Sequence, residues 1–462
     1  MTGVPPAAAT RPYGSMRGMA RATNGKRAEL LNRKWLYPGM HVKRWLLLLF
    51  VGITLGGLGL ALYLRGLYDQ GYRFPPSFYY ITLQFWPRPV RAMIVGGIGI
   101  TAIIVAIMRL QQSLLAALLP QPRSRDALAN LIYAHRLARP GPRVVAIGGG
   151  HGLSTLLSGL KLHTSSITAI VNVADDGGSS GRLRRAYGVL PPGDIRRCLA
   201  ALAETDESLM KQLWEYRFPS GEGLQGHTFG NLFLTALDDI TGSFDAAIQA
   251  ASDILAVRGR VLPPTLAEVT LAAELHAPVG AEGRTIEGES EIAKGGLPIG
   301  RVFLRPPNPP AYPEAVRAIL EADMVVLGPG SLFTSVLPVL LVGDILRALR
   351  ASRGLRVYVC NVATEPGETD NFGAGAHLQA LLGHIGSDCV DIALVNENLQ
   401  PADNFAPEWQ GRTAIVSPDV DGGAGMRLVT ADIINTANPL RHDPAKLADQ
   451  LMRLLGERDG RN

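Results

Sequence analysis

Hydrophobic runs that end in glycine or polar turns alternate with helical patterns from residue 144 onward. Short apolar runs predict buried β-strands, and apolar residues at every third or fourth position predict helices. The expected strands are 144–147, 167–173, 324–327, 357–361 and 392–395. The expected helices are 153–160, 195–203, 208–216, 229–239, 244–251, 312–321 and 332–350. Strands joined by crossover helices predict an α/β, Rossmann-like fold, with a mostly parallel sheet and helices on both faces.

The pattern changes between residues 258 and 305. Runs such as EVTLAAEL and RVFLRP alternate between apolar and polar residues, and this period of two is typical of antiparallel strands. We therefore predict a small antiparallel β insertion at 258–305, inside a domain that spans 143–440. Residues 441–462 are predicted to form a C-terminal helix and tail.

Two uncharged apolar runs precede this domain. Residues 45–64 are long enough to cross a bilayer, and residues 92–108 lie at the short end of the spanning range of about 17–25 residues. A cleaved signal peptide is the alternative for the first run, and a buried core helix is the alternative for the second. We predict a transmembrane helical hairpin within 41–119, a disordered tail at 1–40 and a linker helix at 120–142.

Lysine and arginine flank both apolar runs. Their balance places both termini in the cytoplasm and the connecting loop outside. The expected location is therefore the cell membrane, as a multi-pass protein of the inner membrane with its folded domain in the cytoplasm. The same residues account for much of the net charge of +5, so we expect no nucleic-acid partner. The three cysteines form no CxxC or metal-binding pattern.

Glycine clusters follow two of the predicted strands. The run from Gly148 to Gly152 opens a helix, and Gly328-Pro329-Gly330-Ser331 repeats the arrangement later in the chain. Glycine lets backbone N–H groups approach a ligand closely, and a helix N-terminus attracts anions. A plain tight turn is the alternative. No Walker lysine follows either cluster and no GxSxG elbow is present, which argues against an ATPase P-loop and an α/β-hydrolase.

Acidic and polar residues end the second predicted strand. Asp175 and Asp176 can hold a hydroxyl-rich ligand, a divalent metal or a reacting proton, and a solvated, capped turn is the alternative. His227 lies one helical turn before Asn231, and a structural histidine is the alternative there. The candidates for catalysis are Asp175, Asp176 and His227. The sequence predicts no cofactor outright; Mg²⁺, held by the acidic pair, is the candidate.

The residues expected to bind the ligand, above all its phosphate, lie in these clusters and in the polar turns after the strands. They are Gly148, Gly149, Gly150, Gly152, Ser154, Asn172, Gly178, Ser179, Ser180, Arg182, Asp194, Arg197, His227, Asn231, Gly328, Gly330, Ser331, Thr334, Asn361 and Thr364. Because ligands bind at the carboxyl ends of strands in open α/β sheets, we expect these loops to face one another across one sheet.

Several longer motifs carry a family resemblance. IGGGHGLSTLLSGLK, IVNVADDGGSSGRLRR, LPPGDIRRCLAALA, LQGHTFGNL and CNVATEPGETDNFGAGAHLQAL follow one another between residues 144 and 397. With them the chain resembles the YvcK family, the gluconeogenesis factors, within the CofD-like superfamily. The resemblance implies a Rossmann-like fold and binding of a nucleotide sugar such as UDP-N-acetylglucosamine. It also implies a role in carbon flux and in cell shape, through synthesis of the cell envelope.

The CofD branch of this superfamily is similar in fold. Its members are transferases that join a phospholactate unit to a deazaflavin precursor with a divalent metal, and Asp175 and Asp176 match the acidic pair at their active site. The motifs GGSSGRLRR and QGHTFGN fit the YvcK branch better. The family leads us to expect an acidic residue before His377, where this chain has Ala376.

Three functions remain open on the sequence. The first is a nucleotide-sugar-binding regulator tethered to the inner membrane, and the second is a CofD-type 2-phospho-L-lactate transferase. The third is an NAD(P)-dependent oxidoreductase. It is the weakest of the three, because no acidic residue beyond Asp175 has the usual ribose-binding spacing. Whether the ligand is only sensed or also transformed stays open. We expect a homodimer or a higher oligomer.

Overall fold

The computed structural model describes residues 141–458 and 460, apart from 205–208, 277–283, 401–404, 406, 408 and 421–425. It also describes residues 51–57 and, with gaps, short runs and single positions between 83 and 109. The chain divides into two compact units, Met1–Leu131 and Ile132–Asn462.

The N-terminal unit holds the two predicted spans, 45–64 and 92–108, and the described residues cover each of them only in part. Residues 51–57 are helical, and a Cβ on Gly99 would lie 2.5 Å from the backbone nitrogen of Gly56. Among the described residues, no single helix is long and apolar enough to cross a membrane. One pair of helical segments, Leu332–Leu340 and Gly343–Ala351, would be long and apolar enough if taken together, but the two are bent by 77°. The first of them is buried in the core of the second unit.

The second unit is built on a seven-stranded parallel sheet of order β10-β9-β8-β7-β1-β2-β3. Its strands are β1 (Val144–Gly148), β2 (Ile167–Val171), β3 (Arg260–Leu262), β7 (Met324–Leu327), β8 (Leu355–Val359), β9 (Ile392–Asn396) and β10 (Arg427–Ala431). Every residue of β1, β2, β7 and β9 is buried. Because successive side chains point to opposite faces, both faces of the sheet are covered there.

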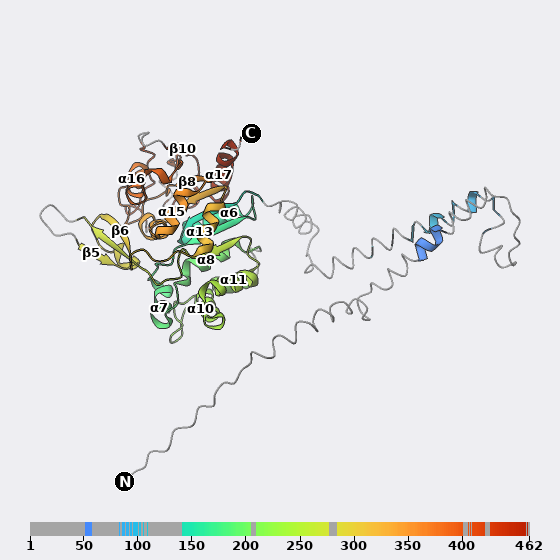
Figure 1. The fold of residues 1–462 in the computed structure, drawn as a ribbon, viewed down its shortest axis with the longest axis horizontal. Helices are drawn as coiled ribbons and strands as arrows, with labels where there is room; N and C mark the ends of the chain where they lie inside the picture. Colours follow the sequence, from blue (N-terminus) through green and yellow to red (C-terminus); the bar gives the residue numbers. More distant parts are fainter. Residues whose placement is uncertain are drawn as a thin grey trace, which may run out of the picture. The chain divides into compact units, whose positions relative to one another are not determined.

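The helices of this unit connect the strands and pack on one another. They are α6 (Gly150–Leu160), α7 (Gly178–Tyr187), α8 (Pro192–Leu202), α9 (Leu209–Glu215), α10 (Phe229–Thr241), α11 (Phe244–Leu255), α12 (Glu289–Ile292), α13 (Pro313–Glu321), the π-helical η2 (Leu332–Val336), α14 (Leu337–Leu340), α15 (Gly343–Ala351), α16 (Ala374–Ile385), the 3₁₀ turn η3 (Ser387–Cys389) and α17 (Pro444–Arg458). Helix α6 packs against α8 and α17, and α13 packs against α15. Figure 1 shows α7, α8, α10 and α11 grouped together, in green.

A second, smaller sheet is antiparallel, in the order β5-β4-β6. It consists of β4 (Thr270–Leu275), β5 (Arg284–Glu287) and β6 (Ile299–Arg305), and it lies to one side of the main sheet in Figure 1. The predicted α/β, Rossmann-like fold with a small antiparallel insertion is therefore confirmed. The insertion begins later than residue 258, because β3 pairs in parallel with β2. A strand of three residues shows too little alternation to reveal which sheet it joins.

Two helical predictions need correction. The helix expected at 332–350 is broken into η2, α14 and α15, and Pro338 stands in the first turn of α14, where a proline is tolerated because its missing N–H needs no partner. Helix α7 occupies Gly178–Tyr187, where the sequence predicts only a glycine-rich turn. Its first residues are glycine and serine, which are poor helix formers, so the pattern does not reveal it.

Candidate ligand-binding site

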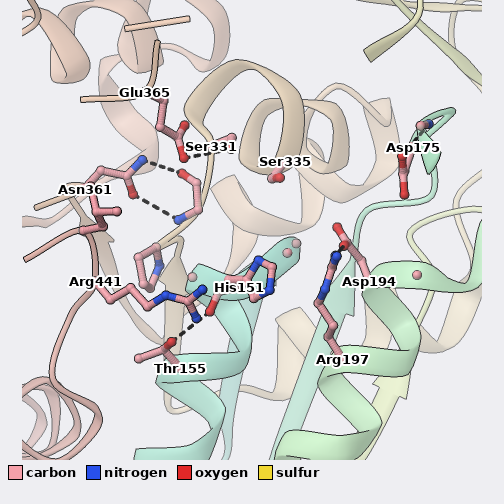
Figure 2. Close-up of a pocket in the computed structure, with 18 of the residues that line it drawn as sticks. His151, Thr155, Asp175, Asp194, Arg197, Ser331, Ser335, Asn361, Glu365 and Arg441 are labelled. Carbon is pink, nitrogen blue, oxygen red and sulfur yellow. Dashed lines mark hydrogen bonds and ion pairs between the residues drawn. The ribbon is translucent and has the colours of Figure 1, made fainter. Parts of the chain in front are cut away.

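A cavity of about 590 Å³ opens at the carboxyl ends of the central strands. Loops that follow β1, β2, β7 and β8 line it, through residues 149–152, 175, 177–180, 329–331 and 361–366 (Figure 2). Parallel strands end on the same edge of a sheet, so loops far apart in the sequence meet there. The four loops that the sequence predicts to face one another do so.

The cavity divides the predicted ligand-binding residues into two groups. The wall includes Gly149, Gly150, Gly152, Gly178, Ser179, Ser180, Asp194, Arg197, Asn231, Gly330, Ser331, Asn361 and Thr364, and also the catalytic candidate Asp175. The wall does not include Gly148, Ser154, Asn172, Arg182, His227, Gly328 and Thr334, nor Asp176. Several of these support the wall from behind: the Asn172 side-chain amide, for example, donates to the Thr334 carbonyl oxygen at 2.9 Å.

The N-terminus of α6 is occupied by a carboxylate of the protein itself. The Gly150 N–H donates to Asp194, and a Cβ on Gly149 would lie 2.4 Å from Asp194 Oδ2. Asp194 Oδ1 also pairs with Arg197 Nη1 at 2.7 Å (Figure 2). A negative group at a helix N-terminus is stabilised by the free N–H groups and the helix dipole. The glycine cluster is therefore an anion site, as predicted, but its anion is Asp194.

Burial governs the acidity of the carboxyl groups around this turn. It raises the pKa of Asp194, against the opposing effects of Arg197 and the Gly150 N–H. Burial also raises the pKa of Asp175, and the nearby Asp194 carboxylate raises it further. Asp175 accepts hydrogen bonds from the Gly177 N–H at 2.8 Å and from Ser180. Asp175 is thus a cavity carboxyl group with a strengthened hold on a proton.

The turn after β7 is also occupied by carboxylates. Ser331 Oγ donates to Glu365 Oε1 at 3.0 Å, and Thr334 donates to Glu368 through both Oγ1, at 3.0 Å, and its N–H. The Gly330 N–H donates to Asn361 Oδ1 at 3.1 Å. Burial raises the pKa of Glu365 to about 7, and burial together with Glu365 raises that of Glu368 to about 8. These two groups therefore keep a proton near neutral pH more readily than ordinary glutamates do.

The N-terminus of α7 differs from both of these turns. The N–H groups of Gly178, Ser179 and Ser180 have no acceptor among the described residues, and no side chain caps the helix. The first turn of α7 contains no acidic residue. Gly178 has φ +47°, a left-handed conformation that favours glycine. The free N–H groups line the cavity, which makes this turn the open anion site.

The cavity has a strongly basic side. Arg196, Arg197, Arg217 and Arg441 line it together with His151. Burial lowers the pKa of His151 to about 4, and Arg197, Arg441 and Arg196 lower it too, so the imidazole is neutral at pH 7. In Figure 2, Arg441 extends toward His151 from the segment before α17. Among the described residues, the Arg441 guanidinium has no hydrogen-bond or ion-pair partner and is therefore available to a ligand.

The two aspartates after β2 do not act at one place. Asp175 lines the cavity, whereas Asp176 Oδ1 accepts a hydrogen bond from the Ser290 N–H at 2.9 Å, at the start of α12. In the part of the chain that the structure describes, no group of three or more histidine, cysteine or acidic side chains could hold a metal. These residues do not fit a resident Mg²⁺ held by the predicted pair.

Other residues of the wall were not predicted from the sequence. They include Thr155, Glu289, Ser335, Glu365, Glu368, Trp409, Leu440, Arg441 and His442. Glu365 and Glu368 belong to the quoted motif TEPGETD, which was the one available signal. Arg441 and Trp409 lie in loops with no periodicity, and only the fold brings them to the strand ends. His377 makes no hydrogen bond to an acidic side chain among the described residues, although Asp419 is near enough to raise its pKa: its Nδ1 is 2.9 Å from the Gly373 oxygen, and its Nε2 is buried without a hydrogen-bond partner.

Comparison with known families gives a match over nearly the whole second unit. Residues 144–434 match the family model of CofD, described as 2-phospho-L-lactate transferase. A "Gluconeogenesis factor" of Bacillus subtilis is 44% identical over 320 residues, which cover 68% of this chain and 99% of that protein. A "Putative gluconeogenesis factor" of a Nostoc species is 43% identical over 92% of each chain, so that match extends beyond the CofD region.

A solved structure supports the same assignment. The crystal structure of a protein from Bacillus halodurans is similar, with a TM-score of 0.64 and 42% sequence identity. It covers 68% of this chain and 99% of the other. The likeness therefore concerns the folded unit that carries the cavity.

Proposed function

The chain belongs to the CofD family and, within it, to the gluconeogenesis factors of the YvcK type, and on this basis we propose that its cavity binds a nucleotide sugar such as UDP-N-acetylglucosamine. In this proposal the protein is a regulator of carbon flux and of cell shape, through envelope synthesis. The ligand reports the supply of envelope precursors and is released unchanged.

The observation that carries the proposal is that three kinds of chemistry line one cavity. The free N–H groups of α7 and the guanidinium of Arg441 suit phosphate. Glu365 and Asn361, on the opposite side from Asp175 in Figure 2, offer oxygens to sugar hydroxyl groups. Trp409 offers an aromatic surface to a base. A volume of about 590 Å³ lies within the range of about 300–1,000 Å³ for small-molecule sites.

The experiment is a calorimetric titration of the full chain with UDP-N-acetylglucosamine, once with Mg²⁺ and once with a chelator. We expect binding in both conditions, and mass spectrometry should recover the ligand unchanged. Arg441→Ala should weaken binding at least tenfold, because it removes a charge-assisted contact of roughly 1.5–3 kcal/mol. Arg347→Ala is the matched control, since Arg347 is an exposed arginine paired with Asp344 and does not line the cavity. Absence of binding would refute the proposal.

A CofD-type transferase is the second candidate, and one observation favours it. Asp175 lines the cavity with a raised pKa, caused by burial and by Asp194, so it can take up a proton from a reacting hydroxyl group near neutral pH. If the protein converts a deazaflavin precursor in the presence of Mg²⁺, this candidate replaces the regulator. Asp175→Asn would then abolish turnover while leaving ligand binding measurable.

We also propose that residues 45–64 and 92–108 anchor the protein in the inner membrane, with the folded unit in the cytoplasm. The close approach of Gly56 and Gly99 supports this, because small residues let membrane helices pack at short distance. Protease treatment of inverted membrane vesicles tests it. Cleavage of the loop around Asp69 from the cytoplasmic side would rule out the hairpin. The expected homodimer or higher oligomer stays a prediction.

A further inference from the structure

Ser179, at the start of α7, is a buried residue of the cavity wall, with 6% of its surface exposed. Its Oγ lies 3.0 Å from His227 Nδ1 and 3.0 Å from Asn231 Nδ2. A serine beside a histidine suggests an activated nucleophile, in which the imidazole accepts the hydroxyl proton. Whether this pair can work in that way depends on where the protons of His227 and Asn231 lie.

Arg182 fixes the proton of His227. Its Nε lies 3.0 Å from His227 Nε2, and a guanidinium can only donate hydrogen bonds. His227 Nε2 must therefore be the unprotonated nitrogen, and the neutral ring carries its proton on Nδ1. Burial, followed by Arg182 and Arg217, lowers the pKa of His227, which keeps the ring neutral at pH 7. The imidazole consequently donates to Ser179 Oγ and cannot act as its base.

Arg196 fixes the amide of Asn231 by the same reasoning. Its Nε donates to Asn231 Oδ1 at 3.0 Å, so the carbonyl end of the amide faces Arg196. The NH₂ end then faces Ser179 Oγ and donates to it. Arg196 is itself buried, and its backbone oxygen accepts from Trp214 Nε1 at 3.0 Å, which holds this segment in place.

Two donors thus occupy both acceptor positions of the Ser179 hydroxyl group. Its own proton has no acceptor among the described residues and is left to point into the cavity. We propose that Ser179 is a fixed hydrogen-bond donor that, with the free N–H groups of Gly178, Ser179 and Ser180, binds a fully deprotonated oxyanion of the phosphoryl type. Arg182 and Arg196 act as positioning residues, through His227 and Asn231.

This inference deepens the proposed function, and it rests on that function only in taking the oxyanion to be a phosphoryl group of the ligand. The donors of Ser179 and of the α7 N–H groups favour an oxygen that carries no proton, because a protonated oxygen would place its hydrogen against another hydrogen. Ser179 is therefore a ligand-binding residue and not a nucleophile.

The first test needs no ligand. Long-range ¹H–¹⁵N NMR of the full chain labelled at histidine distinguishes the two neutral tautomers of His227, with His227→Gln used to assign the signal. We expect the Nδ1–H tautomer at pH 7. The Nε2–H tautomer would overturn the inference even if the nucleotide sugar binds.

The second test uses inorganic pyrophosphate as the probe, with affinity measured by calorimetry. Ser179→Ala should weaken binding at least tenfold, because one hydrogen bond to a charged oxygen is lost. Ser179→Thr keeps the hydroxyl group and should retain most of the affinity. Ser158→Ala is the matched control: Ser158 lies in α6, donates to the Ser154 oxygen at 2.9 Å and does not line the cavity.

A serine-directed fluorophosphonate should leave Ser179 unmodified, and specific labelling there would also contradict the inference. If pyrophosphate binds in a Ser179-dependent way while UDP-N-acetylglucosamine does not bind, the inference stands and the proposed ligand is wrong. Equal pyrophosphate affinity of the wild-type protein and Ser179→Ala would overturn the inference.

Discussion

The N-termini of α6 and α7 make an instructive pair, since each follows a buried strand through a glycine-rich turn and borders the same cavity. Asp194 accepts the Gly150 N–H at the start of α6 and lies against Gly149. At the start of α7, the N–H groups of Gly178, Ser179 and Ser180 meet no acceptor among the described residues. An internal carboxyl group therefore reaches the first helix start, whereas the three N–H groups at the second are left for a ligand.

The turn after β7 belongs with α6 in this comparison. Glu368 accepts from the Thr334 N–H and hydroxyl group, so a carboxyl group of the protein also occupies that helix start. Capping by an internal acid stabilises a helix, but it also fills the place that an anionic ligand would take. A glycine-rich helix start is therefore open to an anionic ligand only where its N–H groups have no acceptor within the protein.

The largest effect is expected at Asp194. Asp194→Ala should lower the free energy of unfolding by about 2–3 kcal/mol, because it uncaps α6 and leaves Arg197 without its partner. Chemical denaturation of the ligand-free protein measures this. The matched control is Glu321→Ala, which breaks an exposed pair with Arg317 at 2.9 Å and should change stability far less, because surface ion pairs contribute little. Equal costs for the two variants would show that Asp194 is not a structural cap.

Glu365 and Glu368, which accept hydrogen bonds from the turn after β7, should make the stability of the fold depend on pH. Glu365 and Glu368 hold protons up to a pKa of about 7 and about 8 in the folded state, against 4.5 ordinarily. Folding therefore takes up protons between pH 4.5 and about 8, and the free energy of unfolding should fall as pH rises from about 5 to about 8. Urea denaturation across this range measures the slope.

Glu368→Gln should flatten this pH dependence, because it removes one of the titrating groups. Glu321→Gln should leave the slope unchanged, since the hydrogen bond from Arg317 lowers the pKa of Glu321 and places its titration below this range. A slope as steep in Glu368→Gln as in the wild-type protein, or a stability that rises with pH, would contradict the assignment of these carboxyl groups as proton-holding caps.

The smallest effect concerns α7 itself. Gly178 and Gly188 stand at its two ends with φ of +47° and +69°, and a Cβ would meet no atom within 4 Å at either position. Gly178→Ala and Gly188→Ala should each cost about 1 kcal/mol of stability, through backbone strain alone. Only Gly178→Ala should weaken pyrophosphate binding, severalfold, because only this residue belongs to the open turn. Equal affinities for the two variants would remove α7 from the binding site.

Much of the fold follows from local patterns. The strand Met324–Leu327 has the predicted bounds, and β1, β2 and β9 lie within one or two residues of theirs, because continuous apolar runs mark strands buried on both faces. Helix α7 was not predicted from the sequence, since its start consists of glycine and serine and its length depends on tertiary contacts. The membership of β3 in the main sheet likewise depends on pairing with β2, which a three-residue run does not encode.

The loops of the candidate site were predictable from the sequence, but the roles of its individual residues were not. The polar turns after the strands were found because the carboxyl ends of parallel strands must lie together. The structure separates Asp175 from Asp176, because Asp175 lines the cavity whereas Asp176 accepts a hydrogen bond from the Ser290 N–H. Arg441 and Trp409 come from distant loops with no local pattern, so no feature of the sequence indicated them.

The repeated arrangement of buried strand, glycine turn and helix follows from the local sequence, because hydrophobic runs and glycines set the conformation of the residues around them. Which helix start stays open depends instead on contacts between segments that are distant in the chain. That outcome depends on whether a carboxylate from elsewhere in the fold, such as Asp194 or Glu368, reaches the free N–H groups. It also depends on Arg182 and Arg196, which orient the hydrogen-bond donors of His227 and Asn231 toward Ser179 although these residues lie far apart in the chain.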